Sequence, residues 1–123
     1  MRNNRRITGA IVAALILLSE NVAFAHAQLR RAVPAPAAIV GTAPSEVLLN
    51  FSESLEASFS SVVVRDSVGK RVDTADAHLD TGDRTTMRVS LTPLVPGIYI
   101  VEWRVLTADT HRAEGAFIFR VGQ

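Results

Sequence analysis

The strongest structural signal in the chain is the decapeptide Pro96-Gly97-Ile98-Tyr99-Ile100-Val101-Glu102-Trp103-Arg104-Val105. Its first two residues, Pro and Gly, predict a turn. After the turn, large apolar side chains recur at every second position, from Tyr99 to Val105. Because successive side chains of a β-strand point to opposite faces, this row predicts one buried face of a long strand.

Shorter rows of the same kind lie on both sides of this stretch. They are Val47, Leu49 and Phe51; Val62 and Val64; Met87, Val89 and Leu91; and Phe117, Phe119 and Val121. Turn-forming residues separate the rows, and only residues 53–60 could hold a helical turn. Several short strands with regular turns are typical of an all-β sandwich or barrel, and we expect about seven strands.

The beginning of the chain has the features of a secretory signal peptide. Three arginines precede an uninterrupted apolar run from Ala10 to Leu18, and Ala23-Phe24-Ala25 follows as a small-x-small cleavage pattern. The apolar run is about half of the roughly 20 residues that a membrane-spanning helix needs. We therefore expect removal of residues 1–25, export to the periplasm and no membrane insertion of the mature domain, residues 26–123.

A second cleavage position stays open, because Ala25-His26-Ala27 also has the small-x-small pattern. Cleavage after Ala25 leaves His26 as the first residue, whereas cleavage after Ala27 removes it. In the first case the mature domain has ten basic and eleven acidic side chains and no basic patch, so we expect no nucleic-acid partner. The chain has no cysteine, which excludes thiol ligands and disulfides.

The three histidines of the chain differ in their surroundings. An N-terminal His26 offers its α-amine and a ring nitrogen to one ion, and such nitrogens suit Cu(II). Asp109-Thr110-His111 adds a carboxylate and an imidazole, which share a face if the segment is extended. Three nitrogens and one oxygen form a set that Cu(II) prefers, with one ion per chain.

His78 lies in a polar segment, and we expect a surface histidine there. We expect the carboxylates around it to keep this edge soluble; they are Asp73, Asp76, Asp80 and Asp83.

The order of these motifs resembles the CopC family of periplasmic copper-resistance proteins over essentially the whole mature chain. The resemblance rests on four stretches: His26-Ala27-Gln28-Leu29, Leu49-Asn50-Phe51-Ser52-Glu53, the decapeptide of residues 96–105, and Asp109-Thr110-His111 with Gly115-Ala116-Phe117-Ile118-Phe119-Arg120-Val121. It implies an immunoglobulin-like Greek-key β-sandwich.

The resemblance also implies a Cu(II) site and a role. The site would consist of His26, Asp109 and His111, with Glu53 beside it as a ligand or as an outer-shell partner of a ligand. The role would be that of a copper carrier or buffer in homeostasis or resistance, without enzymatic activity, and its partners would be the copper ion and an inner-membrane copper-transport protein. Some members add a methionine-rich Cu(I) site. Met87 is the single methionine after the predicted leader, so we expect a protein that binds Cu(II) only.

Two other functions stay open. An N-terminal histidine with a second histidine also resembles the copper brace of oxidative polysaccharide-cleaving enzymes. The additional Asp109 carboxylate and the small size of the domain disfavour this enzyme. The other alternative is a metal-free sandwich used in adhesion or assembly, in which His26 and His111 would be replaceable by alanine without loss of function.

Overall fold

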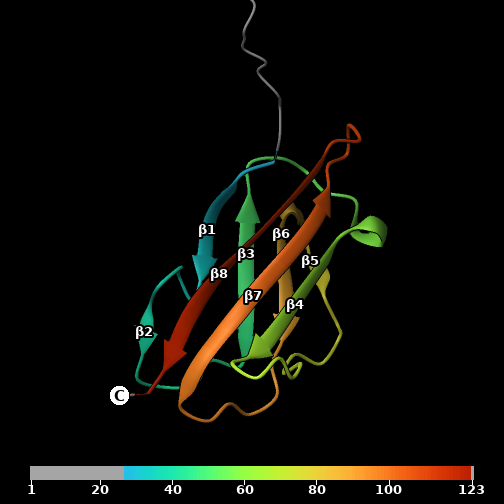
Figure 1. Ribbon diagram of the computed structural model, residues 1–123. Helices are drawn as coiled ribbons and strands as arrows, with labels where there is room; N and C mark the ends of the chain where they lie inside the picture. Colours follow the sequence, from blue (N-terminus) through green and yellow to red (C-terminus); the bar gives the residue numbers. More distant parts are fainter. Residues whose placement is uncertain (1–26, 123) are drawn as a thin grey trace, which may run out of the picture.

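The computed structural model describes residues 27–122, which form eight strands and one 3-10 turn (Figure 1). Residues 1–26 and 123, and with them the predicted signal peptide and His26, lie outside the described residues. The elements are β1 (Leu29–Val33), β2 (Ile39–Val40), β3 (Glu46–Phe51), η2 (Ala57–Phe59), β4 (Ser61–Asp66), β5 (His78–Asp80), β6 (Asp83–Ser90), β7 (Gly97–Leu106) and β8 (Arg112–Val121).

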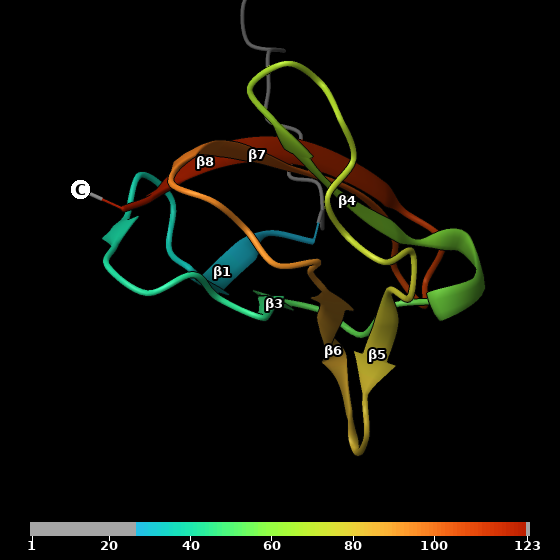
Figure 2. The ribbon, with the colours of Figure 1, turned by 90° about the horizontal axis from the view of Figure 1, so that it is seen from below.

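The strands form two four-stranded sheets that face each other, as the view from below shows (Figure 2). The first sheet has the strand order β1-β3-β6-β5, and the second has the order β2-β8-β7-β4. All neighbouring strands are antiparallel except β2 and β8, which are parallel. The pairs β3–β6 and β4–β7 join strands that are not consecutive in the chain. The predicted all-β, immunoglobulin-like Greek-key sandwich is confirmed.

The alternating apolar rows of the sequence form the core between the two sheets. Side chains with at most 1% exposure come from both layers; they include Val47, Leu49, Phe51, Met87 and Val89 from the first sheet and Val62, Val64, Val101 and Phe119 from the second. The eight strands of residues 27–122 agree with the expected number of about seven, and among those that the sequence rows did not show, β2 and β5 have only two and three residues. Strands of that length contain too few side chains to produce a recognisable alternation.

The two large aromatic residues of β7 pack differently. Tyr99 is 3% exposed, stacks on Phe119 with 5.5 Å between ring centroids, and donates its hydroxyl proton to the carbonyl of Val95. Trp103 is only half-buried, and its ring lies 6.0 Å from that of Phe51 and 6.2 Å from that of Phe117. Both rings belong to the inner face, but Trp103 lies closer to solvent than a core anchor would.

The expectation that Asp73 is a solubilising edge residue is wrong. Its side chain is fully buried, and its carboxylate accepts hydrogen bonds from the amides of Val64 and Ala75 at 2.7 and 2.8 Å. The Arg71 guanidinium pairs with the same carboxylate at 2.9 Å. A buried carboxylate is tolerated when charge-assisted hydrogen bonds replace its water. Asp73 therefore fastens the segment after β4 to the outer edge of that strand.

Candidate metal centre

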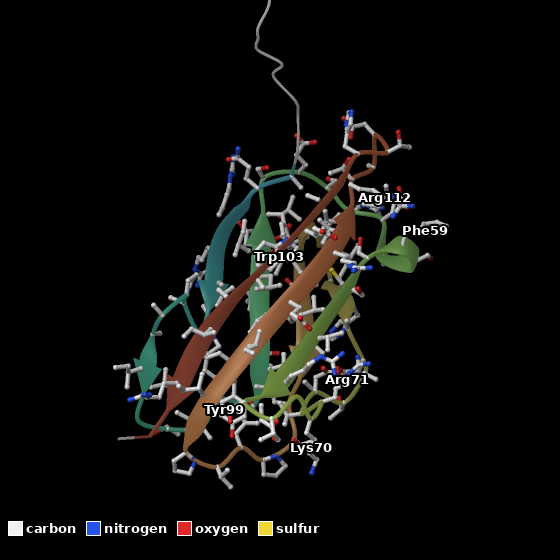
Figure 3. The ribbon with its side chains drawn as sticks, viewed as in Figure 1. Phe59, Lys70, Arg71, Tyr99, Trp103 and Arg112 are labelled. Carbon is white, nitrogen blue, oxygen red and sulfur yellow. The ribbon has the colours of Figure 1, made fainter. Side chains whose placement is uncertain are left out.

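Three segments that carry candidate ligands meet at one end of the sandwich. The described chain begins at buried Ala27, β3 ends at Phe51, and the β7–β8 connection spans residues 107–111; all three lie at the upper end in Figure 1. Figure 3 shows Arg112, directly after this connection, at that end, whereas Tyr99 and Lys70 lie at the opposite end. The two sheets thus bring distant parts of the sequence to one surface.

Backbone hydrogen bonds join these segments to each other. Gln28 and Ser52 are connected twice: the Ser52 amide donates to the Gln28 carbonyl and the Gln28 amide donates to the Ser52 hydroxyl, both at 2.9 Å. On the other side, the Ala108 amide donates to the Ser54 carbonyl at 2.9 Å. The segment around Glu53 therefore links the start of the described chain to the Asp-x-His connection.

Asp109 and His111 form a pair on the surface at this end. His111 Nδ1 lies 3.1 Å from Asp109 Oδ1, and the two side chains are 46% and 56% exposed, respectively. A carboxylate and an imidazole side chain so close together can serve one metal ion. The hydrogen bond from Thr107, followed by the hydrogen bond and the charge of His111, lowers the pKa of Asp109 below its ordinary value. The carboxylate is therefore in the ionised form that a cation needs.

The side chains of Asp109 and His111 do lie next to each other, but the extended backbone assumed for the motif is wrong. Residues 108–110 form a turn, and Thr110 has a left-handed conformation with φ 71°. The Thr110 amide donates to the Thr107 carbonyl, and the Thr107 amide donates to the His111 carbonyl. A tight reversal, and not strand alternation, brings the two side chains together.

The described residues provide two donors of the predicted set. Within residues 27–122 there is no group of three or more His, Cys, Asp or Glu side chains that could hold a metal ion. The remaining predicted ligand, His26, lies outside the described residues. Two side chains leave a metal ion under-coordinated, since copper and zinc sites in proteins have at least three or four ligands. The pair fits a copper ion only together with further donors.

Glu53 and His78 occupy different environments. Glu53 is half-buried and lies between Ser52 and Ser54, the two residues that bond to the start of the described chain and to the Asp-x-His connection. This position is compatible with both roles considered for its carboxylate. His78 is exposed on β5, and its Nδ1 lies 2.7 Å from the Asp76 carbonyl oxygen. The prediction of a surface histidine at position 78 is confirmed.

Sequence reasoning missed Thr107, whose hydroxyl donates to Asp109 Oδ1 and accepts the His111 amide proton at 2.9 Å. Its side chain is fully buried at the base of the exposed turn. A possible signal was the hydroxyl residue two positions before an aspartate, a spacing at which local side-chain hydrogen bonds form in turns.

These features define a class of protein: a small β-sandwich that presents an imidazole and a carboxylate at the end where its described residues begin. The chain belongs to the CopC family, because the family model described as the CopC domain matches residues 29–122. Protein YobA of Escherichia coli K12 is 35% identical over 99 residues, which are 80% of each chain. Copper resistance protein C of Pseudomonas syringae pv. tomato is 32% identical and covers 96% of this chain and 97% of its own.

Solved structures agree with this assignment. CopC from Methylosinus trichosporium OB3b has a TM-score of 0.74 at 32% identity, over 79% of this chain and 94% of that one. PcoC from Escherichia coli, described as a methionine rich copper resistance protein, has a TM-score of 0.71 at 32% identity, over 79% and 99%. Within residues 27–122 the structure has no helix of the length and hydropathy needed to cross a membrane.

Proposed function

We propose that this protein is a periplasmic copper carrier or buffer that holds one Cu(II) ion per chain. The ligands are the α-amine and imidazole of an N-terminal His26, the Asp109 carboxylate and the His111 imidazole. The observation that carries this proposal is the Asp109–His111 pair, with 3.1 Å between Oδ1 and Nδ1, at the end of the sandwich where the described chain begins.

The connectivity of the chain supports the participation of His26. His26 is bonded directly to Ala27, and consecutive Cα atoms are about 3.8 Å apart. Ala27 is 6% exposed, and Gln28 is held to Ser52 by two hydrogen bonds. The residue that follows the proposed N-terminal ligand is therefore anchored to the fold. A chelate attached to an anchored residue would lose less conformational entropy on binding than one at the end of a free segment.

The relatives and the methionine content support copper as the cargo and Cu(II) as its form. Three relatives are named copper resistance protein C, and PcoC is described as a methionine rich copper resistance protein. After the predicted leader this chain has only Met87, which is 0% exposed in the core, so its thioether does not face solvent. Nitrogen and carboxylate donors favour Cu(II), whereas Cu(I) prefers thioethers and thiolates.

The proposal includes export and a transport partner. Cleavage after Ala25 would create the free amine of His26 and release residues 26–123 into the periplasm. Copper transport protein CutJ of Bacillus subtilis is 29% identical over 92% of this chain, but the match covers only 21% of that longer protein. A domain of this type inside a longer transport protein supports an inner-membrane copper transporter as the partner of this chain.

A competition titration with Cu(II) tests the ligand set. The protein is produced through its natural export route, its N-terminus is determined by mass spectrometry, and it is compared with a form extended by one residue before His26. We expect one tightly bound Cu(II) in the processed protein and a large loss of affinity after extension or in His111→Ala. The matched control is His78→Ala, which removes an exposed histidine outside the pair.

Other results would contradict the proposal. Equal affinity of the extended and processed forms would exclude the N-terminal chelate. A processed chain that begins at Gln28 and binds Cu(II) tightly would exclude His26 as a ligand. Copper-dependent oxidation of a polysaccharide by the copper-loaded protein would show that the protein is an enzyme and not a carrier. No binding by any form would favour a metal-free sandwich.

A further inference from the structure

Thr107 combines complete burial with a location at the edge of the most exposed candidate ligands. Its relative exposure is 0%, whereas Ala108, Asp109, Thr110 and His111 are all exposed. It follows β7 directly and forms an antiparallel bridge with Leu55, which is also 0% exposed. The backbone of Thr107 therefore belongs to the rigid part of the fold, and the turn after it extends into solvent.

The hydroxyl of Thr107 contacts both members of the exposed pair. Thr107 Oγ1 donates its single proton to Asp109 Oδ1 and accepts a hydrogen bond from the His111 amide at 2.9 Å. A hydroxyl has one proton and two lone pairs, so both bonds can exist at the same time. One buried atom thus holds the side chain of the first residue and the backbone of the second.

The hydrogen bonds also determine which side-chain atoms of Asp109 and His111 stay available to bind a metal ion. Asp109 Oδ1 accepts from Thr107 and lies 3.1 Å from His111 Nδ1. When Nδ1 carries the ring proton, it donates to Oδ1, and the lone pair of the imidazole is then on Nε2. Asp109 Oδ2 has no hydrogen-bond partner among residues 27–122. In that tautomer, Asp109 Oδ2 and His111 Nε2 are the atoms of the pair that remain for a metal ion.

The geometry points to Thr107 as the positioning residue of the copper site: its buried hydroxyl holds Asp109 and His111 as a pair before the metal ion arrives. This inference rests on the proposed Cu(II) function. Outer-shell partners that orient ligands typically change metal affinity by about 10-fold to 100-fold when they are removed. The effect arises because a preorganised pair loses less conformational freedom on binding than two independently mobile side chains.

Two substitutions separate the hydroxyl from the packing of this side chain. Thr107→Val keeps the branched shape and removes the hydroxyl, and Thr107→Ser keeps the hydroxyl and removes a methyl group. Thr86→Val is the matched control, because Thr86 is also buried at 5% exposure and donates to a carboxylate, Asp83 Oδ2, at 2.8 Å. The measurements are Cu(II) affinity by competition, the Cu(II) electron paramagnetic resonance spectrum and the thermal unfolding midpoint.

We expect Thr107→Val to weaken Cu(II) binding by about 10-fold to 100-fold and to change the Cu(II) spectrum. Thr107→Ser should keep the original spectrum and bind more tightly than Thr107→Val, while Thr86→Val should bind as the unsubstituted protein does. The role of Thr107 is overturned if Thr107→Val retains the original affinity and spectrum. It is also overturned if Thr107→Ser loses binding to the same extent, because packing would then explain the effect.

A measurement on the metal-free protein separates this inference from the proposed function. The His111 amide donates to Thr107 Oγ1, so its hydrogen exchange should be faster in Thr107→Val than in Thr107→Ser. If the unsubstituted protein binds no Cu(II), the proposed function fails, and the exchange rates still report whether the hydroxyl holds the pair. Equal exchange rates in the two variants would overturn the positioning role.

Discussion

Gly115 lies directly opposite Trp103 across the β7–β8 pair, and a Cβ atom at position 115 would come within 2.3 Å of the indole ring. Both residues face the interior of the sandwich, where the indole also contacts the rings of Phe51 and Phe117. The absence of a side chain at 115 therefore creates the space that the indole occupies. The φ of Gly115 is not in the left-handed region, so its backbone conformation does not require glycine. The close packing of the Trp103 ring does.

Gly115→Ala should lower the free energy of unfolding by about 1 to 3 kcal/mol, because the new methyl group displaces the Trp103 ring from its packing position. Chemical denaturation measures the loss, and Trp103 fluorescence reports the displacement. Gly41→Ala is the control, since no atom lies within 4 Å of a Cβ built at that exposed position. Equal stability of the two variants would show that the indole relocates without cost.

Asp73→Asn should lower the free energy of unfolding at neutral pH by about 1 to 3 kcal/mol. The amide cannot reproduce the charged hydrogen bonds that the buried carboxylate accepts from Val64, Ala75 and Arg71. The control is Glu102→Gln, which breaks an exposed ion pair with Arg65 and should cost about 0 to 1 kcal/mol. A loss no larger than that of the control would contradict a fastening role for Asp73.

The same carboxylate should make stability depend on pH. Burial alone raises the pKa of Asp73, but the hydrogen bond from Arg71, the amides of Val64 and Ala75 and the Arg71 charge together bring this pKa below its ordinary value. The folded state then binds the proton more weakly than the unfolded chain. Its stabilisation is complete above the unfolded value of about 3.9 and is lost as the pH falls through the lower folded value. Unfolding curves below about pH 4 should therefore show a steeper loss for the unsubstituted protein than for Asp73→Asn. Parallel curves would argue against this role.

Thr110→Gly should raise the free energy of unfolding by about 1 kcal/mol, because a β-branched residue at φ 71° is strained and glycine is not. The greater flexibility of glycine in the unfolded chain offsets part of this gain. Thr42→Gly is the control: Thr42 is exposed and is not among the residues with positive φ, so glycine there should lower stability. Equal losses in both variants would indicate that the turn tolerates threonine without strain.

Glu53→Gln should weaken Cu(II) binding by about 10-fold to 100-fold if the carboxylate orients or supplies a ligand. Glu56→Gln is the matched control, because Glu56 lies in the same segment and faces Arg84 at 3.9 Å. Both variants are compared by competition titration after export and processing. Glu53 has no part in the site if the two variants bind Cu(II) equally well.

The alternating rows determined the fold class without knowledge of the structure. Val47, Leu49, Phe51 and the residues of β7 are spaced so that only strands bury them together, and burial of apolar surface drives folding. The same local chemistry singled out Asp109 and His111 as proposed ligands, since a carboxylate and an imidazole are residue types that bind metal ions. Short strands such as β2 and β5 escaped this reasoning, because two or three residues are too few to show an alternation of apolar and polar side chains.

Tertiary structure alone decided the roles of Asp73, Thr107 and Gly115. Each depends on residues that are distant in sequence or on a turn whose shape the surrounding fold imposes: β4 supplies an amide to Asp73, a bridge to Leu55 fixes Thr107, and β7 places Trp103 over Gly115. Periodicity reports which side chains prefer burial, and it applies along a single strand. Contacts between strands determine which polar group becomes buried and which position must be a glycine. Only the folded sandwich brings these strands together.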